Sequence, residues 1–165
     1  MNENRILDAR EINHKIERIA YQIYETFAAE KEIILAGISG NGFVFANKIE
    51  NKLKTISPIK VLLCEVQIDK QNPFNQIITS LAKEQYENKN IVLVDDVLNS
   101  GTTLIYGVKH FLETSVKKIK TAILIDRNHK KFPVKADFKG ISLSTSLKEH
   151  VHVVFDENNT YAYLI

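Results

Sequence analysis

Two adjacent carboxylates followed by a hydroxyl-rich turn make up the stretch of this sequence best suited to chemistry. Asp95 and Asp96 offer hard oxygen acceptors, which suit a polyol or a magnesium-bound sugar. The segment continues as Val97-Leu98-Asn99-Ser100-Gly101-Thr102-Thr103-Leu104. Its backbone N–H groups, its three hydroxyls and the start of the following helix would together form a cradle for an anion. Gly101 would let a phosphate approach the backbone closely.

A second glycine-rich loop lies earlier in the chain, at Gly37-Ile38-Ser39-Gly40-Asn41-Gly42. Three glycines in six residues mark a tight loop between a strand and a helix. This loop is either part of the same site or an ordinary strand-to-helix turn that needs glycine for its geometry.

The elements that position these loops follow from hydrophobic periodicity. Apolar residues at helical spacing predict a helix over about 9–29, and Asp8 and Glu11 are placed as a capping box at its start. Apolar runs predict buried strands, and helices follow the two glycine loops. The predicted strands are Glu32–Ile38, Ile59–Val66, Asn90–Asp95, Ile119–Ile125, His150–Phe155 and Tyr161–Ile165.

Alternation of strands and helices predicts an α/β fold with a mostly parallel sheet covered on both faces. In such sheets the functional loops lie beyond the carboxyl ends of the strands, which is where both glycine loops fall. Residues 69–89 have a weaker pattern and predict a mobile loop with a short strand near Gln76–Thr79.

Composition indicates one globular domain over residues 1–165. The single cysteine, Cys64, excludes a disulfide framework and suits a reducing compartment, and we expect a cytoplasmic protein with no membrane span. The formal charge of +2 is too small to indicate nucleic-acid binding by itself.

The segment Val94–Leu104 resembles the signature of type I phosphoribosyltransferases that binds 5-phosphoribosyl-1-pyrophosphate (PRPP). Within that family the chain is most similar to the pyrimidine-operon attenuation regulators, which also act as uracil phosphoribosyltransferases. The similarity continues through Ile6–Arg10, Gly37–Gly42, Ile125–His129 and Phe132–Gly140. It implies the type I fold, a small hood from the C-terminal part, and a homodimer or larger assembly.

The resemblance also implies roles for individual residues. Asp95 and Asp96 would be the catalytic pair, accepting from the ribose hydroxyls directly or through Mg²⁺. The 5-phosphate would be held by Asn99, Ser100, Gly101, Thr102 and Thr103. The pyrophosphate would meet Ser39, Gly40, Asn41, Gly42 and Lys70. The base would be bordered by Arg127, Asp137, Phe138 and Ile141.

Two of these roles have simpler alternatives, because Lys70 could be a solvated loop lysine and Arg127 could pair with Asp126 or Asp137. The chain also departs from the regulators at Ser39, Asn41 and Thr102, where they carry basic residues. Asn99 stands where purine enzymes commonly have an aspartate, which favours a pyrimidine because an amide cannot act as an acid or base near neutral pH.

Three functions therefore compete. The first is an enzyme that joins PRPP to a nucleobase, with uracil favoured. The second is a nucleotide-sensing regulator that binds RNA, although the basic surface that RNA needs is thin in this sequence. The third is a relic of the enzyme that binds PRPP without turnover.

Overall fold

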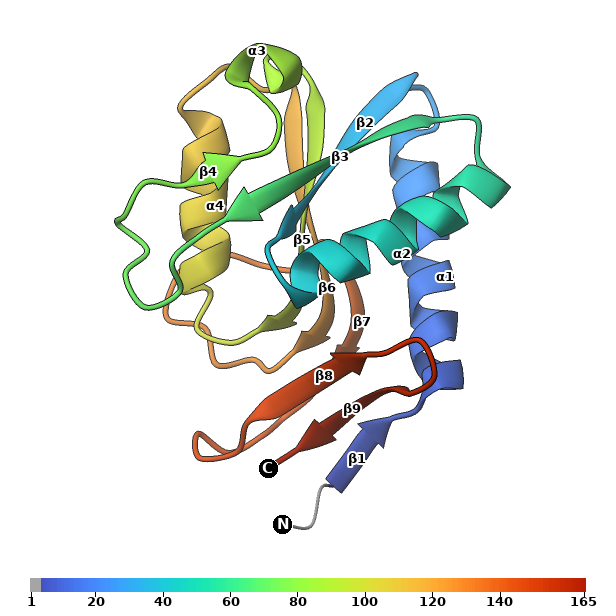
Figure 1. Cartoon of the computed structure of the whole chain (residues 1–165), viewed down its shortest axis with the longest axis vertical. Helices are drawn as coiled ribbons and strands as arrows, with labels where there is room; N and C mark the ends of the chain where they lie inside the picture. The colour runs from blue at the N-terminus through green and yellow to red at the C-terminus, as the bar shows by residue number, and fades with distance from the viewer. Residues whose placement is uncertain (1–3) are drawn as a thin grey trace.

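The computed structural model describes residues 4–165, and its centre is a six-stranded sheet with strand order β4-β3-β2-β5-β6-β7 (Figure 1). The strands are β2 (Glu32–Ile38), β3 (Lys60–Gln67), β4 (Ile78–Thr79), β5 (Asn90–Leu98), β6 (Lys118–Asp126) and β7 (Phe138–Ser142). Neighbouring strands run parallel, except that β4 is antiparallel to β3. This confirms the predicted α/β class.

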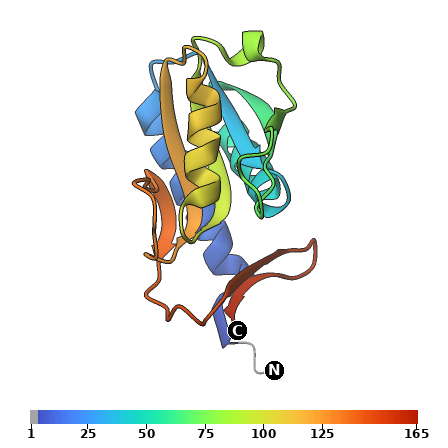
Figure 2. The same cartoon turned by 90° about the vertical axis from the view of Figure 1, so that its left-hand side faces the viewer.

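The inner strands are buried on both faces, which is why they appear in the sequence as continuous apolar runs. Successive side chains of β2 alternate between two cores: Ile33 and Leu35 pack on one side of the sheet, and Ile34 and Ala36 pack on the other. Helices α1 (Ala9–Phe27) and α2 (Asn41–Ile56) cover the first face. Helix α4 (Thr102–Leu112) and the short α3 (Lys83–Tyr86) cover the second (Figures 1 and 2).

The start of α1 is the predicted capping box. The backbone N–H of Glu11 donates to Asp8 Oδ1 over 2.8 Å, and the backbone N–H of Asp8 donates to Glu11 Oε2 over 2.9 Å. The N–H groups of Asp8 and Glu11 both gain an acceptor in this way. The N–H of Glu11 lies in the first helical turn and would otherwise have no acceptor within the helix.

A second sheet, here called the hood, consists of β1 (Asn4–Leu7), β9 (Thr160–Leu164) and β8 (Val151–Phe155) in antiparallel order β1-β9-β8. It lies beyond the carboxyl ends of the parallel strands (Figure 1). The sequence predicted a hood from the C-terminal part alone, and the structure adds β1. This strand escaped prediction because it is short, half exposed and paired only with the far end of the chain.

The segment predicted as a mobile loop is more structured than expected. Asp69 Oδ1 accepts from the backbone N–H groups of Gln71 and Asn72, and the predicted short strand is β4. Tyr86 is buried and packs edge-on against Phe111, with ring centroids 5.0 Å apart. The second half of the segment is therefore anchored to α4, and the loop proper spans residues 69–77. Among the described residues, no helix is long and apolar enough to cross a membrane.

Candidate functional site

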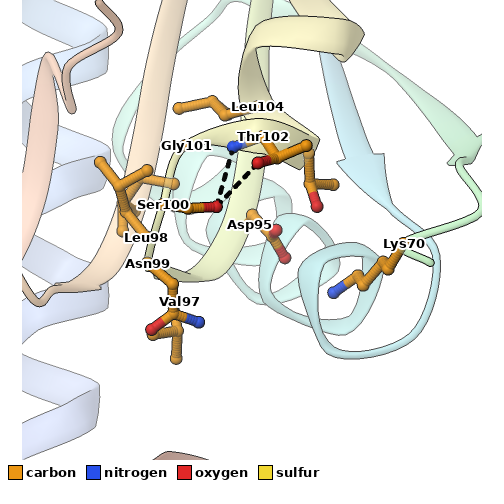
Figure 3. A pocket seen from close by; sticks show the side chains of 11 residues that line it. Lys70, Asp95, Val97, Leu98, Asn99, Ser100, Gly101, Thr102 and Leu104 are labelled. Carbon is orange, nitrogen blue, oxygen red and sulfur yellow. Dashed lines mark hydrogen bonds between the residues drawn. The ribbon is translucent and has the colours of Figure 1, made fainter. Parts of the chain in front are cut away.

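A cavity of about 270 Å³ opens at the carboxyl ends of the central strands (Figure 3). Most of its lining comes from the end of β5 and the start of α4, with Lys70 reaching in from the 69–77 loop. The lining residues are Lys70, Asp95, Val97, Leu98, Asn99, Ser100, Gly101, Thr102, Thr103, Leu104 and Ile123. One cavity thus contains a carboxylate, a hydroxyl-rich turn and an exposed lysine.

Asp95 and Asp96 lie where β5 leaves the core. Asp95 is 5% exposed, and its Oδ1 accepts from the backbone N–H of Asp96 over 2.9 Å. Asp96 is half-buried; its Oδ1 accepts from the backbone N–H of Val97, and its Oδ2 accepts from Asn41 Nδ2 over 3.1 Å. The two carboxylates are therefore fixed by the backbone that follows them.

Burial, together with the neighbouring negative charge of Asp96, raises the pKa of Asp95 to about 8, while the positive charge of Lys70 acts in the opposite direction. The protonated form of Asp95 therefore persists to a higher pH than that of a carboxyl group in water. Cations or hydroxyl donors that approach the group favour its charged form and lower its pKa again.

The raised pKa has a consequence for stability. Between pH 4 and pH 8 the folded protein keeps a proton that the unfolded chain has lost, so the free energy of unfolding falls as pH rises across this window. Asp95→Asn cannot lose a proton. We expect its melting temperature to exceed that of the wild type by a margin that grows from pH 5 to pH 8, at about 2–4 °C for each kcal/mol.

Thermal unfolding at a series of pH values measures this margin. Asp69→Asn is the control. Hydrogen bonds from the backbone of Asn72 and Gln71 lower the pKa of Asp69, so this carboxylate contributes to the free energy of unfolding above the pKa of a free aspartate. That contribution is lost only in more acidic solution, below the pH range of the experiment. A margin for Asp95→Asn that stayed constant from pH 5 to pH 8 would contradict the assignment.

The turn between β5 and α4 has a geometry that would suit an anion. Gly101 adopts φ +83° at the N-cap of α4, and a Cβ there would lie 2.7 Å from Val134 Cγ1. Ser100 Oγ and Thr102 Oγ1 are hydrogen-bonded over 2.8 Å (Figure 3). Behind the turn, the backbone N–H of Lys131 donates to the Ser100 carbonyl over 2.7 Å. The backbone N–H of Thr102 donates to Ser100 Oγ over 3.3 Å. The next N–H groups of α4 lack acceptors within the helix, as in the first turn of any helix, and can serve a ligand.

The loop Ser39–Gly42 adjoins the carboxylates but does not line the cavity. Ser39 Oγ donates to Glu65 Oε1 over 3.0 Å, and Asn41 Nδ2 donates to the Val153 carbonyl of the hood over 2.8 Å as well as to Asp96. Gly40 adopts φ +86°, and the peptide bonds of residues 4–165 are all trans. Glu65 was not singled out in the sequence; a carboxylate at the end of a buried strand beside a glycine loop is the signal that could have found it.

The four residues predicted at the base are not brought together. Ile141 lies near the carboxyl end of β7, level with Ile125, but Phe138 belongs to the core on the α1 side. Asp137 precedes β7, and its carboxylate accepts from the backbone N–H of Thr121 over 3.0 Å. A parallel strand carries its amino end away from the site, so Asp137 and Phe138 lie at the end of β7 remote from the cavity mouth.

Arg127 is buried, and it bonds to neither Asp126 nor Asp137. Its guanidinium donates to Asn99 Oδ1 over 2.8 Å, to Thr145 Oγ1 over 3.0 Å and to the Ser146 and Glu149 carbonyls. Lys130 lies near Asp126 and Lys135 near Asp137 instead. Arg127 therefore contacts both the turn Asn99–Thr103 and the segment that leads into the hood.

The donor set restricts which metal the site could hold. Among the described residues there is no cluster of three or more His, Cys, Asp or Glu side chains that could bind a metal ion. Asp95 and Asp96 suit Mg²⁺, which proteins commonly bind through one or two carboxylates plus phosphate oxygens of the substrate. The residues present therefore fit a magnesium ion that arrives with a phosphorylated ligand.

Comparison with known proteins agrees with this geometry. The model of the phosphoribosyl transferase domain matches residues 2–158. The "Bifunctional protein PyrR" of Macrococcus caseolyticus is 31% identical, with 99% of each chain covered, and that of Fusobacterium nucleatum is 34% identical, with 92% of this chain and 90% of the relative covered. A hypoxanthine-guanine phosphoribosyltransferase from Bacillus anthracis superposes over 100% of both chains with a TM-score of 0.78 at 18% identity.

Proposed function

Since the chain belongs to the phosphoribosyltransferase family, we propose that it transfers the phosphoribosyl group of PRPP to uracil and releases pyrophosphate. The observation that carries this proposal is the single cavity in which the Asp95 carboxylate meets the Asn99–Thr103 turn at the start of α4. A sugar phosphate needs both groups, one for its hydroxyls and one for its phosphate.

Each part of the site has a task in this reaction. The turn and the N-terminus of α4 hold the 5-phosphate, and Asp95 and Asp96 accept hydrogen bonds from the ribose hydroxyls. Lys70 faces the cavity and stabilises the pyrophosphate as it leaves. Ser39, Gly40, Asn41 and Gly42 adjoin the same end. The N–H of Ser39 donates to the Val66 carbonyl, so the N–H groups of Gly40, Asn41 and Gly42 are the ones that can meet the pyrophosphate. A bound Mg²⁺ would supply charge neutralisation for the phosphate oxygens.

Catalysis in this scheme needs no protein nucleophile. The ribosyl carbon becomes cationic as the bond to pyrophosphate lengthens, so the site must stabilise charge and exclude water. The 69–77 loop, which carries Lys70, is the segment positioned to close over the ligand. The Ser39 and Asn41 side chains are engaged by Glu65, Asp96 and Val153, so the pyrophosphate is left to backbone N–H groups and Lys70.

PRPP-dependent release of pyrophosphate, assayed with uracil, cytosine, hypoxanthine and guanine, tests the proposal. We expect release with uracil and at least about tenfold less with each other base, because a mismatched hydrogen-bonding edge leaves polar groups unpaired. Faster release with a purine would contradict the choice of base. PRPP binding without release for any base would identify a relic.

A nucleotide-responsive RNA-binding regulator is the second candidate, and it is favoured by the name "Bifunctional protein PyrR" of the relatives, which implies a second role. RNA binding by contact with phosphates must weaken steeply with salt. Titration with pyrimidine-operon leader RNA at rising salt, with and without UMP, distinguishes this role from catalysis alone.

The proposal also includes a cytoplasmic location, with Cys64 as a free buried thiol, and a homodimer or larger assembly.

A further inference from the structure

The Arg127 side chain links two parts of the molecule that a ligand in the cavity would touch. Only 6% of the residue is exposed, and each of its three guanidinium nitrogens donates a hydrogen bond. One branch reaches Asn99 on the turn that lines the cavity, and the others reach residues 145–149, which lead into β8. With four of its five N–H donors engaged inside the protein, Arg127 is poorly placed to read a base directly.

The contact with Asn99 fixes the orientation of an amide. A guanidinium group has donors only, so the atom of Asn99 that lies 2.8 Å from Arg127 must be its carbonyl oxygen. The Nδ2 group of Asn99 is then directed away from Arg127. Figure 3 shows this nitrogen on the side of the cavity that holds Lys70, and Asn99 is exposed to an incoming ligand.

We propose that Arg127 is a positioning residue that holds Asn99 as a fixed hydrogen-bond donor toward an acceptor oxygen of the ligand. The inference rests on the proposed function and names the chemistry of one contact in that site. The acceptor is either an oxygen of the 5-phosphate or a carbonyl oxygen of the base. A ligand that presents an N–H group at this point leaves two donors facing each other and is rejected.

The same arginine connects this contact to the hood. Thr145 Oγ1 and the carbonyls of Ser146 and Glu149 accept from Arg127, and His129 Nε2 lies 2.6 Å from the Thr145 carbonyl. The segment entering β8 is therefore held in register with the turn that carries Asn99. Loss of Arg127 should disturb both at once, whereas loss of Asn99 should affect the ligand contact alone.

Equilibrium binding of ribose 5-phosphate, UMP and Mg²⁺–PRPP, measured by titration calorimetry, tests the assignment. Asn99→Ala should weaken ribose 5-phosphate and UMP alike by about ten- to hundredfold if the acceptor is the phosphate. It should weaken UMP alone by about three- to tenfold if the acceptor is a base carbonyl. Asn99→Asp keeps a partner for Arg127 but removes the donor, and it should bind at least as weakly as Asn99→Ala.

The link between the two residues is measured with a double-mutant cycle. Arg127→Lys should weaken the same ligands as Asn99→Ala, and in the double variant the free-energy losses should be clearly less than additive, because both changes remove one contact. Independent structural roles would give additive losses. Arg18→Gln is the matched control. Arg18 also donates to backbone carbonyls, those of Lys139 and Gly140, but it lies outside the cavity. The Arg18→Gln variant should bind all three ligands as tightly as the wild type does.

The outcomes distinguish failure of the proposed function from failure of the inference about Arg127 and Asn99. If the wild type binds none of the three ligands, the proposed function is wrong and the inference fails with it. If the wild type binds these ligands and both Asn99→Ala and Asn99→Asp bind them as tightly as the wild type, the inference alone is overturned. Additive losses in the cycle overturn the role of Arg127. Should Arg127→Lys not fold, the comparison of Asn99→Asp with the wild type still decides whether Asn99 acts as a donor.

Discussion

Exchange of both site carboxylates for amides, as Asp95→Asn with Asp96→Asn, should weaken Mg²⁺-dependent PRPP binding by about a hundredfold or more while the protein stays folded. In the proposed site each carboxylate accepts hydrogen bonds from the ribose hydroxyls, worth about 1.5–3 kcal/mol each because the acceptor is charged, or it coordinates the metal ion. Asparagine matches aspartate in volume, so no cavity forms at the buried Asp95, and its Oδ1 can still accept from the backbone N–H of residue 96.

Titration calorimetry with and without Mg²⁺ measures the loss, and circular dichroism verifies the fold. Asp156→Asn is a suitable control, because this aspartate lies in the turn between β8 and β9, where its side chain accepts from the Glu157 backbone and does not line the cavity. Unchanged PRPP affinity in the double variant would mean that the ribose binds elsewhere.

Gly42→Ala should disrupt the same site by steric means. A Cβ at position 42 would lie 2.8 Å from Asp95 Oδ1 and 3.0 Å from the Val94 carbonyl, closer than such atoms approach. Relief of this overlap requires either the buried carboxylate or the backbone of β5 to move, at a cost of about 1–3 kcal/mol in stability. Since Asp95 is displaced, we expect PRPP affinity to fall at least about tenfold.

Gly107→Ala is the matched control for this change. The Cβ it adds would meet Leu93 Cδ2 at 2.9 Å, but that atom ends a flexible side chain that can rotate away. Alanine also favours the middle of α4 by about 0.5–1 kcal/mol over glycine. PRPP titrations of the two variants should therefore differ, and equal affinity in both would show that the approach of Gly42 to Asp95 does not shape the site.

The sequence predicted the central sheet well because its inner strands are buried on both faces and its helices have one apolar side. The capping box of Asp8 and Glu11 located the start of α1 to within a residue. Less could be inferred where an element depends on a distant partner. Strand β1 is recognisable only through its pairing with β9, and the burial of Tyr86 only through Phe111 and His110.

For the site, the sequence predicted which neighbouring residues of the chain act together, but it did not predict contacts between distant segments. Asp95 through Thr103 form one short segment, so their joint placement follows from the strand, turn and helix they span. The hydrogen bonds of Asn41 with Asp96 and of Arg127 with Asn99 join segments that are far apart in the chain, and no spacing in the sequence indicates them. The resemblance to the family placed Asp137 and Ile141 together at the base, but the extended backbone of β7 separates the two.

A crystal structure of the protein with PRPP and Mg²⁺ tests the central claim most directly. The account predicts the 5-phosphate on the backbone N–H groups of residues 99–103, with the ribose hydroxyls or the metal ion at Asp95 and Asp96 and the pyrophosphate beside Lys70. Ordered PRPP at another place, such as the cavity between Phe74 and Tyr106 on the outer side of α4, would contradict it.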